Sequence, residues 1–147
     1  MAYEYRYRRR VEFADTDMAG IVHFARLLCF AEEAEHEFLR SLGLSVHHQS
    51  NGQMFGFPRL ATRFEFLRPL KFEDEVEIHL WVRHKREKTL TYQFRFAKNG
   101  DAIAQGEITV ICCRVKDGGK VKSVPLPPSY ADQIEEAPHA PLEFFEE

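Results

Sequence analysis

Hydrophobic and polar residues alternate along four segments of the chain, at residues 5–13, 60–66, 76–82 and 90–96. Alternation with a period of two is the pattern of a β-strand that buries one of its faces. A fifth strand is expected at 102–115, because the Asn99-Gly100 pair before it is a strong signal for a hairpin turn. The segments therefore predict antiparallel strands, several of them joined by short turns.

The period changes between Val22 and Leu42, where apolar residues lie three or four positions apart. This spacing places them in one stripe along a helix, and Gly43 provides a stop after it. The stripe consists of Phe24, Leu27, Leu28, Ala31, Ala34, Phe38 and Leu42. One long helix among antiparallel strands predicts an α+β fold in which the helix packs on one face of the sheet.

Less regular segments complete the chain. Residues 44–58 contain Gly and Pro without clear alternation, so we expect an irregular connection there. Residues 117–119 predict a turn, residues 121–124 a short strand, and the chain from Ser129 a short helix. From Asp132 onward the chain is acidic, contains two prolines and lacks Lys and Arg. We therefore expect a packed domain at 1–131 and a loosely attached tail at 132–147.

The composition is that of an ordinary globular protein, with 44% hydrophobic and 29% charged residues among 147. A net charge of −3 gives no reason to expect a nucleic-acid partner. The chain start has no apolar signal region and no apolar run approaches membrane-spanning length, so we expect a cytoplasmic protein without a membrane span. Cys29, Cys112 and Cys113 have neither disulfide-framework nor zinc-site spacing, which predicts three buried free thiols and no metal.

Two carboxylates, Asp15 and Asp17, stand between the first predicted strand and the helix. A carboxylate beside a helix N-terminus can attack a carbonyl or activate water, and unpaired backbone N–H groups there can bind an oxyanion. The chemistry of the residues alone leaves a second reading open, in which Asp17 only caps the helix.

The string Asp-Thr-Asp-Met-Ala-Gly-Ile-Val-His-Phe at 15–24 resembles the active-site signature of the 4-hydroxybenzoyl-CoA thioesterase family. Family members have the hotdog fold, a long helix packed on an antiparallel sheet. The resemblance implies an acyl-CoA thioesterase that needs no cofactor and uses Asp17 as nucleophile or general base. His23 stands where many members carry an aromatic residue, so it either assists catalysis or only packs.

The resemblance also implies where the substrate binds. Glycine at position 20 lets the backbone approach the ligand, and N–H groups near His23 and Phe24 would bind the carbonyl oxygen. The basic stretch at 84–88 would meet the CoA phosphates. The substrate-binding candidates are Gly20, Val22, Phe24, Arg59, Arg63, Arg86 and Lys88.

The acyl group and some roles stay open at this point. Leu27 and Arg26 depart from the residues that the family usually has there, and both aromatic and short-chain acyl groups, including 1,4-dihydroxy-2-naphthoyl-CoA, are candidates. The family implies a homodimer or homotetramer with the active site between subunits. Glu33 on the predicted helix is a minor catalytic candidate. The alternatives are a hotdog dehydratase that pairs Asp17 with His23, and a non-catalytic acyl-CoA-binding protein.

Overall fold

A five-stranded antiparallel sheet forms the centre of the computed structural model, which describes residues 1–116 and 119–139. The strands follow the order β1-β5-β6-β7-β4, so β1 and β4 are the edges of the sheet. Their bounds are β1 Glu4–Arg10, β4 Arg59–Phe66, β5 Glu75–Lys85, β6 Thr89–Lys98 and β7 Asp101–Ile111. The strands predicted from alternation are confirmed, except that the first ends at Arg10 and a 3-10 helix (Phe13–Asp15) stands where its end was expected.

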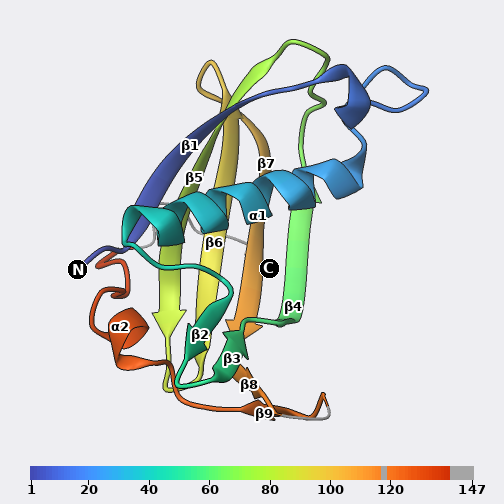
Figure 1. Ribbon diagram of the computed structural model, residues 1–147. Helices are drawn as coiled ribbons and strands as arrows, with labels where there is room; N and C mark the ends of the chain where they lie inside the picture. The colour runs from blue at the N-terminus through green and yellow to red at the C-terminus, as the bar shows by residue number, and fades with distance from the viewer. Residues whose placement is uncertain (117–118, 140–147) are drawn as a thin grey trace.

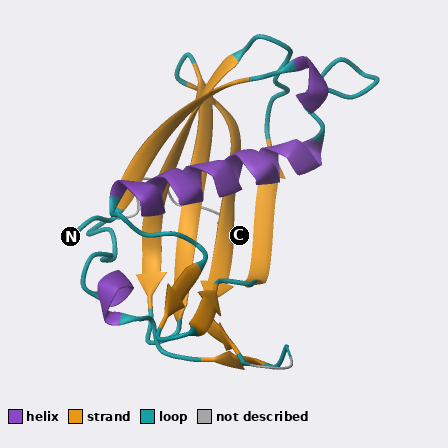
Figure 2. Ribbon diagram, viewed as in Figure 1, coloured by secondary structure: helices purple, strands orange, loops and turns teal. Residues whose placement is uncertain are grey.

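The long helix α1 (Phe24–Ser41) lies across one face of this sheet, with its N-terminal end toward β4 and its C-terminal end toward β1 (Figure 1). Gly43 follows the helix with a φ of +73°, a backbone conformation that favours glycine. Figure 2 shows the resulting two layers, helix on strands, and confirms the predicted α+β architecture.

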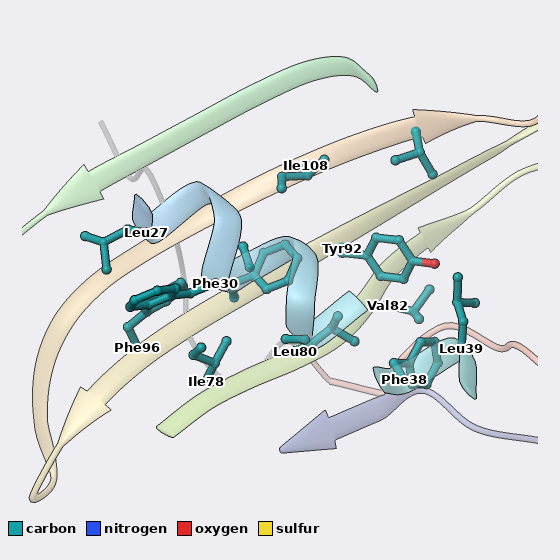
Figure 3. Packing of buried hydrophobic residues seen from close by; sticks show 14 of the residues in the cluster. Leu27, Phe30, Phe38, Leu39, Ile78, Leu80, Val82, Tyr92, Phe96 and Ile108 are labelled. Carbon is teal, nitrogen blue, oxygen red and sulfur yellow. The ribbon is translucent and has the colours of Figure 1, made fainter. Parts of the chain in front are cut away.

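The core lies between α1 and the sheet, as Figure 3 shows. Phe30 and Phe38 of the helix and Leu80 and Phe96 of the sheet are all 0% exposed. The rings of Phe38 and Tyr92 meet edge to face at 6.1 Å, a geometry that contributes about 0.5–1.5 kcal/mol beyond the buried area. This packing fixes α1 on the sheet and so fixes the loop that enters its first turn.

The expectation of an irregular connection at 44–58 is wrong, because the segment contains β2 (His48–Ser50) and β3 (Gln53–Gly56). Asn51 and Gly52 join them with φ values of +52° and +74°, as a two-residue hairpin turn requires. These strands form a second sheet, β2-β3-β8-β9, with β8 (Cys113–Val115) and β9 (Val121–Ser123). The strand expected at 102–115 therefore breaks at Cys112, where the chain leaves the large sheet. Of the expected turn at 117–119, residues 117–118 lie outside the described residues.

Near its C-terminal end, the described chain forms the short helix α2 (Pro128–Ala131) and then runs beside the start of β1. The Ala2 N–H donates to Gln133 O at 2.8 Å, and the Ala137 N–H donates to Val82 O at 2.8 Å. Ile134 between them is 0% exposed. The loose attachment expected from Asp132 onward thus does not hold for residues 133–137, and residues 140–147 lie outside the described residues.

The edge strand β4 pairs with β7, and an aromatic ring of β4 lies over a glycine of β7. Phe64 pairs with Gly106 across the two strands, and a Cβ atom at Gly106 would overlap the Phe64 ring. The other edge of β4 has no strand partner within the described part of the chain. Leu60 and Phe66, near its two ends, are 58% and 48% exposed. An unpaired, partly apolar edge is a surface that can pair with another chain.

Candidate active site

Asp15 closes the connection between β1 and α1 and is only 1% exposed. Its carboxylate accepts hydrogen bonds from the Glu12 N–H at 2.7 Å, Arg9 Nη1 at 2.8 Å and Arg26 Nη2 at 2.7 Å. Burial raises the pKa of Asp15, but the Glu12 N–H and the two guanidinium groups outweigh it and hold this pKa below its usual value. Asp15 is therefore a charged anchor that a substrate cannot reach.

The loop that carries Asp17 leaves this anchor and returns to it. Thr16 and Val22 form an antiparallel bridge at its base, and the His23 N–H donates to Asp15 O at 3.0 Å. In Figure 1 the loop extends beyond the N-terminal end of α1. Folding at the base thus carries Asp17 to the start of the helix.

The inside of the loop is ordered by backbone hydrogen bonds. The Asp17 N–H donates to Ile21 O at 2.9 Å, and the Gly20 N–H donates to Asp17 O at 3.0 Å. Gly20 has a φ of +80°, in the left-handed region that favours glycine. One carboxylate oxygen of Asp17 accepts the Ala19 N–H at 2.8 Å. Asp17 is exposed, so its second oxygen is available for a reaction.

The helix start leaves one backbone donor available. His23 caps the helix, its ring Nδ1 accepting the Ala25 N–H at 3.3 Å, so the neutral ring carries its proton on Nε2. The reading in which Asp17 caps the helix is therefore wrong. The His23 N–H is already bound to Asp15 O. Of the two N–H groups expected to bind the carbonyl oxygen, only that of Phe24 has no acceptor among the described residues.

An apolar groove of about 310 Å³ opens beside this helix start. Its walls come from Val22, Phe24 and Leu27 on one side and from Phe66 and the segment after it on the other. The rings of Phe24 and Phe66 meet edge to face, with their centroids 6.2 Å apart. A larger hollow of about 490 Å³ elsewhere on the surface is lined mainly by charged residues and by none from the Asp17 loop. The groove is the better candidate for an acyl group because its lining is mostly apolar.

The candidate phosphate-binding arginines of β4 lie in different surroundings. Arg59 forms a two-point ion pair with Glu35, at 2.6 and 2.8 Å, and approaches Glu32 at 3.3 Å. Its charge is thus balanced by carboxylates of α1. Arg63 lines a hollow of about 380 Å³ together with Arg83 and neighbouring residues of β5 and β7.

Arg86 and Lys88 lie in the β5–β6 turn, at the opposite end of the sheet from Asp17. The strand register places this turn beside the Arg59 end of β4. The Asp17 loop is bound to the segment just after Phe66, at the other end. β4 has eight residues between these ends, which corresponds to about 25 Å. One subunit therefore does not bring these two cations together with Asp17.

Two arginines that bind Asp15 are part of this site but were absent from the expected set. Arg9 of β1 also donates through Nε to Glu33 at 3.0 Å, and the Tyr7 hydroxyl donates to the same carboxylate at 2.9 Å. Glu33 is thus held against β1, so it is poorly placed as a second catalytic acid. The one feature of the sequence that points to Arg9 is its position two residues after Tyr7. This spacing places both side chains on the same face of the strand.

The described residues contain neither a metal-ligand cluster nor a membrane-spanning helix. Among residues 1–116 and 119–139, no three His, Cys, Asp or Glu side chains lie together as metal ligands. No helix in the same part of the chain is long and apolar enough to cross a membrane. Cys112 and Cys113 are buried free thiols as predicted, whereas Cys29 is exposed, which corrects the prediction for that residue.

The chain has relatives among thioesterases. The profile of the Thioesterase-like superfamily matches residues 11–134. A putative esterase of Aquifex aeolicus is 34% identical over 119 residues, covering 81% of this chain and 90% of that protein. A 1,4-dihydroxy-2-naphthoyl-CoA hydrolase of Thermosynechococcus vestitus is 29% identical over 135 residues, covering 90% and 89%. The solved structure of a gentisyl-coenzyme A thioesterase has a TM-score of 0.73 at 30% identity, covering 85% of this chain and 98% of its own. Sequence, helix-on-sheet architecture and loop geometry agree, and the chain belongs to the Thioesterase-like superfamily with the hotdog fold.

Proposed function

We propose that this protein hydrolyses acyl-CoA thioesters with Asp17 as the catalytic carboxylate. The observation that carries the proposal is the placement of Asp17: its loop is anchored at Asp15, and one of its carboxylate oxygens is available beside the helix start. Support for a CoA thioester comes from relatives that are named as a 1,4-dihydroxy-2-naphthoyl-CoA hydrolase and a gentisyl-coenzyme A thioesterase.

The reaction consumes water and releases a carboxylic acid and the CoA thiol. Asp17 either attacks the thioester carbonyl to form a mixed anhydride that water then opens, or takes a proton from the attacking water. The Phe24 N–H, which has no acceptor among the described residues, would bind the oxyanion, and removing such a donor typically costs about 10²–10³ in rate. Because His23 caps the helix through Nδ1 alone, its Nε2 proton is available to orient water or the thioester.

The groove supports an apolar, ring-sized acyl group. Phe24 and Phe66 offer aromatic surfaces, and Leu27 adds an aliphatic wall. A groove of about 310 Å³ fits one or two fused rings better than a long flexible chain. The naphthoyl and gentisyl groups named for the two relatives are of this kind.

A homodimer formed through β4 accounts for the exposed apolar surface around the site. The outer edge of β4 has no partner among the described strands, and Phe24 beside it and Phe66 at its end are 59% and 48% exposed. Two copies that pair their β4 strands antiparallel around a two-fold axis would satisfy this edge and cover these rings. Further pairing to a tetramer would leave this unit intact.

Antiparallel pairing also brings the basic turn to the active site. It places the Arg59 end of one β4 beside the Phe66 end of the other, so the β5–β6 turn of one subunit approaches the Asp17 loop of its partner. Arg86 and Lys88 of the partner subunit would then hold the CoA phosphates, while Asp17 acts on the thioester. Arg63, in the middle of β4, would lie between these two ends.

A panel of acyl-CoA esters with released thiol as the readout tests the proposed function. We expect benzoyl-CoA, 4-hydroxybenzoyl-CoA and 1,4-dihydroxy-2-naphthoyl-CoA to give higher kcat/KM than butyryl-CoA and palmitoyl-CoA. Binding of all esters without thiol release would show a non-catalytic binding protein. Hydration of crotonyl-CoA without thiol release would show a dehydratase. Either result would overturn the proposal.

A further inference from the structure

Arg26 occupies a position that helix stability does not explain. It lies in the first turn of α1, where the helix dipole disfavours a cation, and 41% of its side chain is exposed. Its Nε and Nη2 atoms both donate to Asp15 Oδ1, at 3.0 and 2.7 Å. Among the described residues, Asp15 is the one hydrogen-bonding partner of this guanidinium.

The two carboxylate oxygens of Asp15 face different elements. Oδ2 accepts the shorter bond from Arg9 of β1, at 2.8 Å, whereas Oδ1 accepts both bonds from Arg26 of α1. Arg9 is also fixed without Asp15, because its Nε atom binds Glu33 at 3.0 Å. Arg26 is thus the side chain that ties the first turn of the helix to the buried anchor.

We propose that Arg26 is a positioning residue for hydrolysis, acting through Asp15 to hold the Asp17 loop against the first turn of α1. The inference rests on the proposed role of Asp17. The base of the loop is joined to the helix start by this ion pair and by the His23 N–H to Asp15 O bond. Both links set where Asp17 stands relative to the Phe24 N–H. Asp17 and the Phe24 N–H would act on the same carbonyl, so a small displacement between these two groups lowers the rate.

The fold should survive loss of Arg26. Without it, the Asp15 carboxylate keeps the Glu12 N–H and Arg9 as donors, so the buried charge stays paired. The Arg26→Ala variant should therefore be folded but slow, with kcat lowered by about 10²-fold, as for a displacement of about 1 Å. KM should stay nearly constant, because Arg26 does not line the groove.

The experiment measures kcat and KM with 4-hydroxybenzoyl-CoA for the wild type, Arg26→Ala and Arg26→Lys. The lysine variant keeps one charged donor and should recover part of the lost kcat. Arg40→Ala is the matched control, because Arg40 is an exposed arginine of the same helix that pairs with Glu37 at 2.6 Å, at the far end from the loop. Combined with Asp15→Asn, the Arg26→Ala change should lower kcat much less, because the ion pair is already lost.

Amide hydrogen exchange of residues 16–23 gives a readout that does not depend on catalysis. Exchange should be faster in Arg26→Ala than in the wild type and unchanged in Arg40→Ala. The inference is overturned by an unchanged kcat, by a raised KM with an unchanged kcat, or by unchanged exchange in the loop. If Asp17→Asn proves fully active, the proposed catalysis fails, whereas the exchange experiment still decides whether Arg26 holds the loop.

Discussion

Asp15 and Asp17 stand two residues apart in one loop, yet Asp15 is 1% exposed and binds two arginines whereas Asp17 is exposed and binds only backbone. The same side-chain chemistry thus serves two purposes, set by the surroundings of each carboxylate. Asp15 is an anchor whose charge is neutralised, and Asp17 keeps an oxygen for reaction. Asp17→Asn should therefore act on the rate alone, whereas Asp15→Asn should lower stability and, by removing the ion pair with Arg26, also slow the reaction.

We expect Asp17→Asn to abolish turnover while leaving the melting temperature nearly unchanged. The substitution keeps the shape and removes the charge that attacks or activates water, so kcat should fall by at least about 10²-fold, with acyl-CoA binding retained. Thiol release and thermal unfolding measure the two effects. Asp17 is not the catalytic carboxylate if the variant keeps more than about a tenth of the wild-type rate.

Asp15→Asn should instead lower stability, and the loss should depend on pH. The pKa of Asp15 is held below the 3.8 of an ordinary aspartate, so its ionised form stabilises the fold above that pH. As the pH falls from about 3.8 through the lower folded-state pKa, the stabilisation disappears. Urea denaturation midpoints from about pH 6 to about pH 2 should show wild type and variant converging in acid. A stability difference that stays constant over this range would contradict the assignment.

Gly106→Ala should destabilise the protein, because the new methyl group would overlap the Phe64 ring. Overpacking of this kind costs about 1–3 kcal/mol, occasionally more. Gly56→Ala is the matched control, since its Cβ would meet nothing within 4 Å. Denaturant unfolding of both variants checks the difference. Adding Phe64→Leu to Gly106→Ala should restore part of the loss, and failure to do so would mean that the ring is not the cause.

The helix and the large sheet follow from the sequence because their signals are local. Apolar spacing at 22–42 predicts α1 to within two residues at each end, at Phe24–Ser41. The β2–β3 hairpin was missed because its strands are short and polar, as in His48-Gln49-Ser50, although Asn51-Gly52 is the same turn signal as Asn99-Gly100.

The arrangement around the site could not be predicted in the same way. Asp15 meets Arg9 and Arg26 only after β1 and α1 have packed together, and no spacing along the chain predicts that contact. From the sequence, Arg59 was expected to bind a phosphate at the surface. In the fold it instead forms an ion pair with Glu35 in the middle of α1. Motif similarity located the candidate catalytic loop, whereas tertiary packing decided which of its charged side chains form ion pairs.

Arg86→Ala combined with Lys88→Ala, called here the basic-turn variant, should raise KM for the acyl-CoA ester and leave kcat nearly constant. A phosphate contact binds substrate and transition state alike, and its effect should shrink with added salt. An acyl-pantetheine thioester, which lacks the nucleotide, is the control substrate. Equal losses with both substrates would show that these residues do not act through the phosphates.

Mixed dimers test whether this basic turn serves the partner's active site. When Asp17→Asn subunits are unfolded and refolded together with basic-turn subunits, each mixed dimer should contain one site with an intact Asp17 and an intact turn from the partner. That site should show the wild-type KM, which neither parent homodimer does.

The matched control mixes wild-type subunits with a chain that carries all three substitutions. Its mixed dimers place each intact Asp17 opposite a substituted turn, so only residual wild-type homodimers should keep the low KM. The reverse outcome, a low KM in the control dimers alone, would place the turn and Asp17 of one site in the same subunit.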